Sequence, residues 1–177
     1  DIVGLPDAAV KESRERVRAA IKNCDYEFPM RRITVNLAPA DTRKAGALYD
    51  LPILLSILIA SGQLSGNFSD TVFIGEVSLD GRLRPINGAL PAAIAATRTG
   101  MKKIVVPADN AGEAALARGA GVVGIGSIPE LVKILKGESE AGITPPPELN
   151  DLNLYSVDFC EVKGQDNAKR ALEIAAA

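Results

Sequence analysis

Residues 71–90 read Thr71-Val-Phe-Ile-Gly-Glu-Val-Ser-Leu-Asp-Gly-Arg-Leu-Arg-Pro-Ile-Asn-Gly-Ala-Leu90. The first four residues are β-branched or aromatic and predict a strand over 71–74. Residues 77–85 predict a β-hairpin that turns at Asp80-Gly81, a dipeptide that suits a type I′ turn. A strand followed at once by a hairpin indicates a domain built from packed layers of sheet and helix.

On the C-terminal side of this stretch, helices and strands alternate. We expect a helix at 88–97 that stops at Gly100, a strand at 103–106, a helix at 110–118, a strand at 121–125 and a helix at 127–136. Ser127 can cap the last helix, with Pro129 in its first turn. This alternation favours an α+β or α/β two-layer domain.

On the N-terminal side, residues 7–22 form an amphipathic pattern that predicts a helix beginning at an Asp7 cap. Residues 32–37 alternate between polar and apolar side chains, which predicts a half-buried strand. A loop at 38–47 follows. Asp50 can then cap a helix over 51–61, whose side chains are apolar on most faces and are therefore expected to be buried.

The composition changes at Gly137. Residues 137–153 include three consecutive prolines and cannot continue a helix, so they predict an extended linker. We accordingly divide the chain into a domain at 1–136, a Pro-rich linker at 137–161 and a helix at 162–177.

The bulk composition limits the function classes. The chain has 177 residues, 47% of them hydrophobic, which suffices for one full core. Twenty basic and 22 acidic side chains give a net charge of −2, so any nucleic-acid-binding surface must be local. The longest apolar run, at 51–60, is too short to cross a bilayer, and we expect no membrane contact and a cytoplasmic location.

Several kinds of site are missing from the sequence. The chain has no histidine, which excludes His-based triads and His-containing zinc sites. Cys24 and Cys160 are expected to be unpaired thiols. Neither a Walker A loop nor a G-x-G-x-x-G motif occurs, so no cofactor and no metal are expected on this chain. Glu76 and Asp80 could share an acid/base or metal site, but a turn role for Asp80 and a backbone or arginine contact for Glu76 are favoured.

Basic residues are the sharpest local charge asymmetry of the chain. They are Lys11, Arg14, Arg16, Arg18, Lys22, Arg31 and Arg32. Such a patch could contact phosphates. Acidic residues are interleaved with it, however, and an ion-paired helix face explains it equally well. The absence of interleaved aromatic residues argues against base stacking.

Four segments, at 1–20, 33–41, 49–52 and 75–90, together resemble the ComM/YifB family of magnesium-chelatase-like AAA+ ATPases. The resemblance implies an N-terminal domain similar to the Lon proteolytic domain, with the ribosomal protein S5 domain 2-like fold and its first strands upstream of Asp1. Residues 162–177 resemble the helix that leads into the AAA+ core. The family is associated with natural transformation, in which a ring-shaped ATPase is thought to drive branch migration of DNA.

The Lon-type peptidase site requires a serine nucleophile and a lysine of lowered pKa. Aligned on the Lon pattern, the serine position falls on Leu48 and the lysine position on Ala92. Ser56 and Ser61 lie too far along the following helix, and Lys44 has no evident serine partner. The resemblance therefore implies a non-catalytic chain.

A domain that keeps such a fold without its dyad is expected to act through its surfaces, in ring assembly or in positioning DNA. The residues expected to contact DNA or a partner are Lys11, Arg14, Arg18, Lys22, Arg31, Arg32, Arg43 and Lys44. The expected partners are the protein's own AAA+ domain, further copies in a hexameric ring and DNA, with ATP and Mg²⁺ bound elsewhere in the parent protein. The alternatives are a magnesium-chelatase-type subunit and an assembly module without DNA contact.

Overall fold

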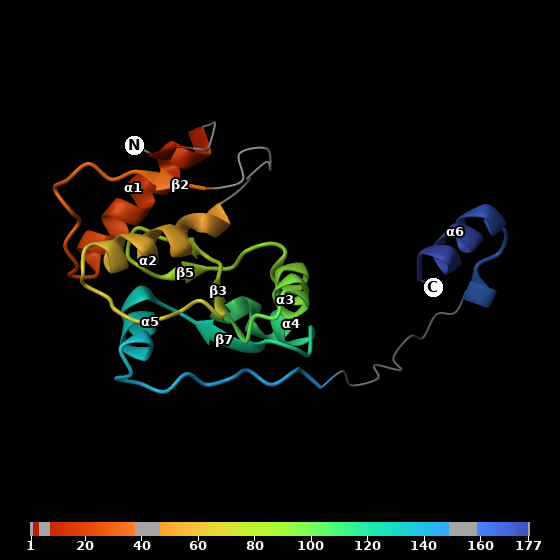
Figure 1. The fold of residues 1–177 in the computed structure, drawn as a ribbon. Coiled ribbons are helices and arrows are strands. Elements are labelled where there is room, and N and C mark those ends of the chain that lie inside the picture. Colours follow the sequence, from red (N-terminus) through yellow and green to blue (C-terminus); the bar gives the residue numbers. More distant parts are fainter. Residues whose placement is uncertain (1, 4–7, 38–46, 149–158, 177) are drawn as a thin grey trace. The chain divides into compact units, whose positions relative to one another are not determined.

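The computed structural model describes residues 2–3, 8–37, 47–148 and 159–176, with the side chains of 2–3, 8–11 and 159 left out (Figure 1). The chain forms two units, Asp1–Pro147 and Glu148–Ala177.

A parallel three-stranded sheet lies at the centre of the first unit. Its strands are β3 (Thr71–Phe73), β6 (Lys103–Pro107) and β7 (Gly121–Ile125), in the order β3-β6-β7. Residues of β6 alternate between its two faces, and both faces are buried. Ile104 belongs to one core cluster and Val105 to the other. Burial of both faces is typical of an all-parallel sheet.

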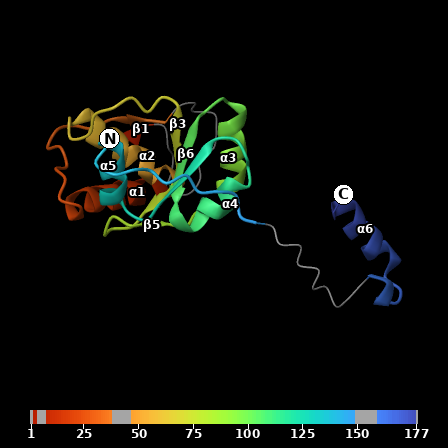
Figure 2. The same cartoon turned by 90° about the horizontal axis from the view of Figure 1, so that it is seen from below.

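Helices cover both faces of this sheet (Figure 2). On one side lie α3 (Ala89–Arg98) and α4 (Ala111–Ala115), which follows a 3₁₀ turn at Ala108–Asn110. Their alanines allow close packing on the sheet. The predicted mixture of helix and sheet is confirmed. The predicted two-layer arrangement is wrong, because helices cover both faces of the sheet.

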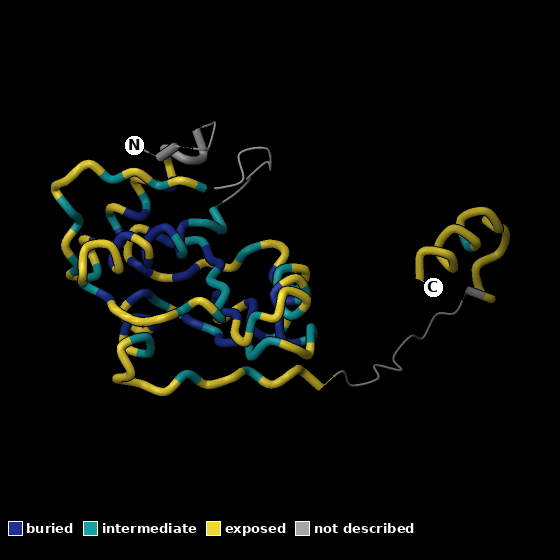
Figure 3. Tube along the Cα trace, in the orientation of Figure 1, coloured by how far each residue is buried: buried dark blue, intermediate teal, exposed yellow. Residues whose placement is uncertain are grey.

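The other face packs against α1 (Ala8–Asn23), α2 (Asp50–Ala60) and α5 (Ile128–Leu135). Side chains from all three helices are fully buried there, among them Ile21 of α1 and Leu54 of α2. Figure 3 shows the buried residues gathered between these helices and the strands. This larger core cluster fixes the position of α1.

Two small strand pairs complete the unit. β1 (Ile2–Val3) pairs in parallel with β2 (Val35–Asn36), and β4 (Glu76–Val77) pairs antiparallel with β5 (Leu83–Arg84). A short 3₁₀ turn at Ala47–Tyr49 leads into α2.

Two local predictions are wrong. Asp50 is not the cap of α2: it is the first helical residue, Tyr49 precedes it, and the Asp50 side chain is fully buried. The hairpin turn is not type I′. That turn requires positive φ at both central residues, but Gly81 has positive φ (+81°) and Asp80 does not. The Ser78 carbonyl instead accepts from the Gly81 N–H at 2.9 Å, closing a turn of the opposite hand.

Other elements differ mainly in length. The strand predicted at 32–37 is reduced to β2, although Ile33, Val35 and Leu37 do alternate with exposed residues. The helix predicted at 110–118 is shortened to α4. The Ser127 cap is confirmed, since its Oγ accepts from the Glu130 N–H at 3.4 Å. The predicted Asp7 cap lies outside the described residues, as does most of the loop at 38–47.

The start of the predicted linker is part of the first unit and packs against its sheet. The Thr144 N–H donates to the Val122 carbonyl of β7 at 2.8 Å, and Ala141 packs against the larger core cluster. We call residues 141–144 the strap. It contacts the outer edge of the sheet, where unpaired backbone groups would otherwise be exposed.

The second unit contains a 3₁₀ turn at Phe159–Glu161 and α6 (Asp166–Ala176). Gly164 and Gln165 both have positive φ and separate the two, so the helix predicted at 162–177 begins later than expected. Leu172 and Ile174 of α6 are more than half exposed. Across the described ranges of the chain, no helix has both the length and the apolarity to cross a membrane.

Candidate nucleic-acid interface

A pocket of about 190 Å³ lies between α1, α2 and the segment that leads into β2. Its floor is apolar: Val17, Ile53 and Ile57 are buried, and Ile33 and Val35 are half-buried. Its remaining lining residues are Phe28 and four arginines, namely Arg14, Arg18, Arg31 and Arg32. None of its described lining residues is acidic, so the described part of the hollow has a cationic rim on a chain of net negative charge.

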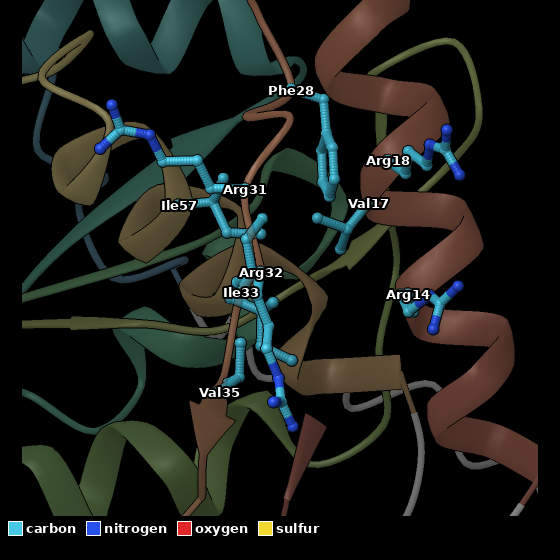
Figure 4. Close-up of a pocket in the computed structure, with 10 residues that line it drawn as sticks. Arg14, Val17, Arg18, Phe28, Arg31, Arg32, Ile33, Val35 and Ile57 are labelled. Atoms are coloured by element: carbon cyan, nitrogen blue, oxygen red, sulfur yellow. The ribbon is translucent and has the colours of Figure 1, made fainter. Parts of the chain in front are cut away.

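The arginines come from two walls. Arg14 and Arg18 stand one turn apart on α1, and residues at this spacing share a helix face. Arg31 and Arg32 come from the opposite wall (Figure 4). Figure 4 also shows the Arg31 guanidinium pointing away from α1. Arg14 is 3.3 Å from the Glu15 carboxylate, an exposed contact that solvent weakens.

Phe28 lies among these arginines. The Arg18 guanidinium carbon is 5.7 Å from the centroid of the Phe28 ring, a cation–π arrangement. The sequence argument against base stacking, that no aromatic residue is interleaved with the basic ones, is therefore wrong. Phe28 follows α1 by only a short turn, and the chain reversal there returns its ring to the basic face of the helix.

A larger groove of about 950 Å³ adjoins the pocket. The two hollows share Phe28, Arg31, Arg32, Ile33, Val35 and Ile57. Beyond the shared residues, the groove adds apolar side chains, the Glu27 carboxylate, and hydroxyl and amide groups from Thr34, Asn36, Ser56, Ser61 and Gln63. Pocket and groove together form a continuous trough, which is cationic at the pocket and lined by both polar and apolar side chains farther along.

The structure brings together half of the predicted contact residues. Arg14, Arg18, Arg31 and Arg32 line the pocket, whereas Lys22 is exposed on α1 but does not. Arg43 and Lys44 lie outside the described residues, and so does the side chain of Lys11. The arginines of the two walls are at least 13 residues apart in sequence. The order of charges along the chain therefore could not show that they line one pocket.

Arg16 has a different role from its basic neighbours. Its Nε donates to Asp50 Oδ2 at 2.8 Å and its Nη2 to Asp50 Oδ1 at 3.2 Å. The same carboxylate accepts from Ser13 Oγ at 2.5 Å and from the Val77 N–H at 3.4 Å. Hydrogen bonding to Asp50 raises the pKa of Arg16 above its ordinary value. This network was not predicted, because an aspartate directly before an apolar run is typical of a helix cap.

This ion pair and the exposed arginines lie on opposite faces of α1. At about 100° per residue, Arg14 and Arg18 lie about 160° around the helix from Arg16. While Arg16 bonds the buried Asp50, Arg14 and Arg18 therefore line the pocket on the other face.

The remaining chemical candidates have structural contacts. Arg84 pairs with Glu76 at 3.9 Å, and Asp80 accepts from Ser78 Oγ and from the Arg82 N–H at 3.2 Å. The hydrogen bond from Ser78 is the main reason that the pKa of Asp80 is lowered. These contacts confirm the favoured turn and ion-pair interpretation. In the parts of the chain that the structure describes, no three His, Cys, Asp or Glu side chains are grouped to hold a metal ion.

The positions aligned with the Lon dyad are apolar and half-buried. Leu48 and Ala92 both pack against the smaller core cluster, beside α3 and α4. Ser56 Oγ donates to the Pro52 carbonyl and Ser61 Oγ to the Leu58 carbonyl, so each hydroxyl is bonded within α2 or at its end. Lys44 lies outside the described residues.

The chain is similar to several known proteins. The chain is 42% identical to protein YifB of Escherichia coli K12 and 38% identical to competence protein ComM of Haemophilus influenzae, in each case over 99% of this chain and 35% of the relative. A Lon protease of Azospirillum brasilense is 27% identical over 60% of the chain and 14% of that protease. The chain thus spans about a third of the length of YifB and ComM.

A family match covers most of the first unit. Residues 1–110 match the family described as subunit ChlI of Mg-chelatase. That range includes the whole trough, the Asp50 network and the hairpin of β4 and β5. The chain therefore belongs to the Mg-chelatase ChlI family of AAA+ proteins, together with its relatives YifB and ComM.

Proposed function

We propose that this chain is a non-catalytic module of a larger AAA+ ATPase that acts on DNA, and that the module positions DNA through its arginine-rimmed pocket. The observation that carries the proposal is that Arg14, Arg18, Arg31 and Arg32 all line one pocket, none of whose described lining residues is acidic. Arginine is suited to this role because its planar fork binds phosphate oxygens in pairs.

The resemblance to ComM supplies the wider setting. In this proposal the parent protein is a cytoplasmic, hexameric ring that binds ATP and Mg²⁺ on its AAA+ core and drives branch migration of DNA in natural transformation. Its front domain adopts the S5 domain 2-like fold of the Lon proteolytic domain. Six copies of the pocket around a ring would provide a repeated cationic lining for a DNA path.

Binding of DNA by the full-length protein across a salt series tests the proposal. Replacing Arg14 and Arg18 by Gln should weaken binding and reduce the slope of log K against log salt, by about 0.9 for each lost contact to duplex phosphate. A matched control replaces Arg98 and Lys133, exposed cations on α3 and α5, by Gln. Equal binding by the pocket variant and the control would refute the proposal.

An assembly module is the second candidate, because one observation favours it. Met30, which lines the larger groove, is fully exposed, and methionine is enriched in protein interfaces. Analytical ultracentrifugation of the full-length protein distinguishes the two. A Met30→Ser variant that dissociates while retaining DNA affinity would support assembly rather than DNA positioning at this surface.

The family description supports a third candidate, a magnesium-chelatase-type subunit. It predicts that the full-length protein stimulates Mg²⁺ insertion into a tetrapyrrole when combined with chelatase partner subunits. A metal-insertion assay with and without the protein measures this directly.

A further inference from the structure

We propose that the pocket is a single-nucleotide subsite for single-stranded DNA, in which an unstacked base packs against Phe28 while the arginines hold the adjoining phosphates. This inference rests on the proposed DNA-positioning function and specifies the strand state that the site accepts. It concerns the aromatic ring and the pocket floor rather than charge alone.

The position of Phe28 is the first reason. Its ring is half-buried on an apolar floor and lies against the Arg18 guanidinium at 5.7 Å. A base that enters the pocket contacts the ring and the guanidinium plane, the two kinds of flat group on which bases stack. Stacking against aromatic side chains tolerates any base because every base has a π face.

The size of the pocket is the second reason. A volume of about 190 Å³ admits a single small group and excludes a double helix. In duplex DNA the faces of each base are covered by its neighbours, so they cannot reach a half-buried ring without unstacking, which costs a few kcal/mol. Duplex DNA can therefore contact only the exposed arginines at the rim.

The course of the trough is the third reason. Phe28 lines both the pocket and the adjoining groove, so a strand that places one base on Phe28 can continue into the groove. There, Thr34 and Asn36 offer a hydroxyl and an amide group to the edges of the next base. The Arg31 guanidinium, which points away from α1, extends the cationic wall beyond the pocket (Figure 4).

The test combines a substitution in the full-length protein with changes in the DNA. Affinity is measured by fluorescence anisotropy for a labelled oligodeoxythymidine, for the same oligomer with abasic positions, and for a mixed-sequence duplex. Phe28→Leu retains an apolar side chain on the pocket floor but removes the ring. We expect it to weaken oligodeoxythymidine binding about 5-fold to 150-fold, the range for loss of one base–aromatic stack.

Three comparisons separate stacking from a general loss of structure. Phe28→Leu should leave duplex affinity and the salt slope unchanged, and its effect should vanish on the abasic oligomer. Phe28→Trp should retain single-strand binding, which a misfolded pocket would not. An oligomer that carries 5-iodouracil should crosslink to Phe28 on irradiation, and peptide mass mapping locates the crosslink.

The outcomes also separate this inference from the function on which it rests. If the Arg14 and Arg18 variant weakens binding of both DNA forms but Phe28→Leu weakens neither, the DNA-positioning proposal stands and the stacking subsite is refuted. If neither variant affects DNA, both proposals fail. If Phe28→Leu instead abolishes binding of an acidic peptide such as polyglutamate and leaves DNA binding unchanged, the pocket is a protein-docking site and the inference is overturned.

Discussion

Replacing Arg16 by Met should destabilise the chain strongly, because it leaves the Asp50 carboxylate buried without a counter-ion. Asp50 has no exposed side-chain surface, and two of its four described hydrogen bonds come from Arg16. Removing one partner of a buried pair costs about 3–5 kcal/mol. The lower end applies here because the Arg16 side chain keeps 22% of its surface exposed, which screens the pair.

The expected loss is therefore about 3 kcal/mol, a large part of the total stability of about 5–15 kcal/mol that is usual for a domain. Urea unfolding followed by circular dichroism measures it. Arg14→Met is the matched control, since that side chain is 55% exposed on the opposite face of α1, and it should change stability by about 0.5 kcal/mol or less. Arg16→Lys should lie between the two, because it keeps the charge but loses the fork.

A double-mutant cycle with Asp50→Asn checks the cause. If Asp50 and Arg16 form the network described, the two substitutions together should cost less than the sum of the single ones, since each removes the other's partner. A loss for Arg16→Met no greater than that for Arg14→Met would refute the reasoning. It would show that water reaches Asp50 in solution.

Three further predictions concern other parts of the chain. Thr144→Pro removes the N–H that the strap donates to Val122 and should cost about 1 kcal/mol, whereas Thr144→Ala keeps the N–H and should cost less; urea unfolding compares them. Burial raises the pKa of the Cys24 thiol above its usual 9.0, so the folded state binds the proton more tightly than the unfolded state, and stability should fall as pH rises above about 9. Cys24→Ala should remove that part of the slope from unfolding curves measured above about pH 9. Finally, the chain should not cleave casein, as the apolar Leu48 and Ala92 imply; cleavage that is lost in a Lys44→Ala variant would contradict this.

Much of the fold can be predicted from local sequence. The amphipathic spacing of α1, the Ser127 cap of α5 and the short β-branched strands β6 and β7 depend on neighbouring residues only, and all are present. The place of the hairpin is predicted correctly too, because the Asp80-Gly81 dipeptide favours a turn. The type of the turn is not, since the contacts of Ser78 with Arg82 and Gly81 select the backbone geometry.

Asp50 shows where local reasoning fails. An aspartate before an apolar run is typical of a helix cap, and the sequence contains no local sign of anything else. Its true partners, Ser13 and Arg16, are more than 30 residues away. Only the packing of α1 on α2 brings them together. Because Asp50 is then fully buried, its charge requires a counter-ion, which Arg16 supplies.

The candidate site divides in the same way. The charge of Arg14, Arg18, Arg31 and Arg32, the lack of histidine and the lack of a phosphate loop are properties of composition and spacing, and the sequence by itself determines them. The pocket instead depends on two chain segments meeting at one face of α1, with Phe28 between them. The two segments come together because the apolar floor of the pocket is buried between them. This burial depends on the packing of the whole core, so no short stretch of residues encodes it.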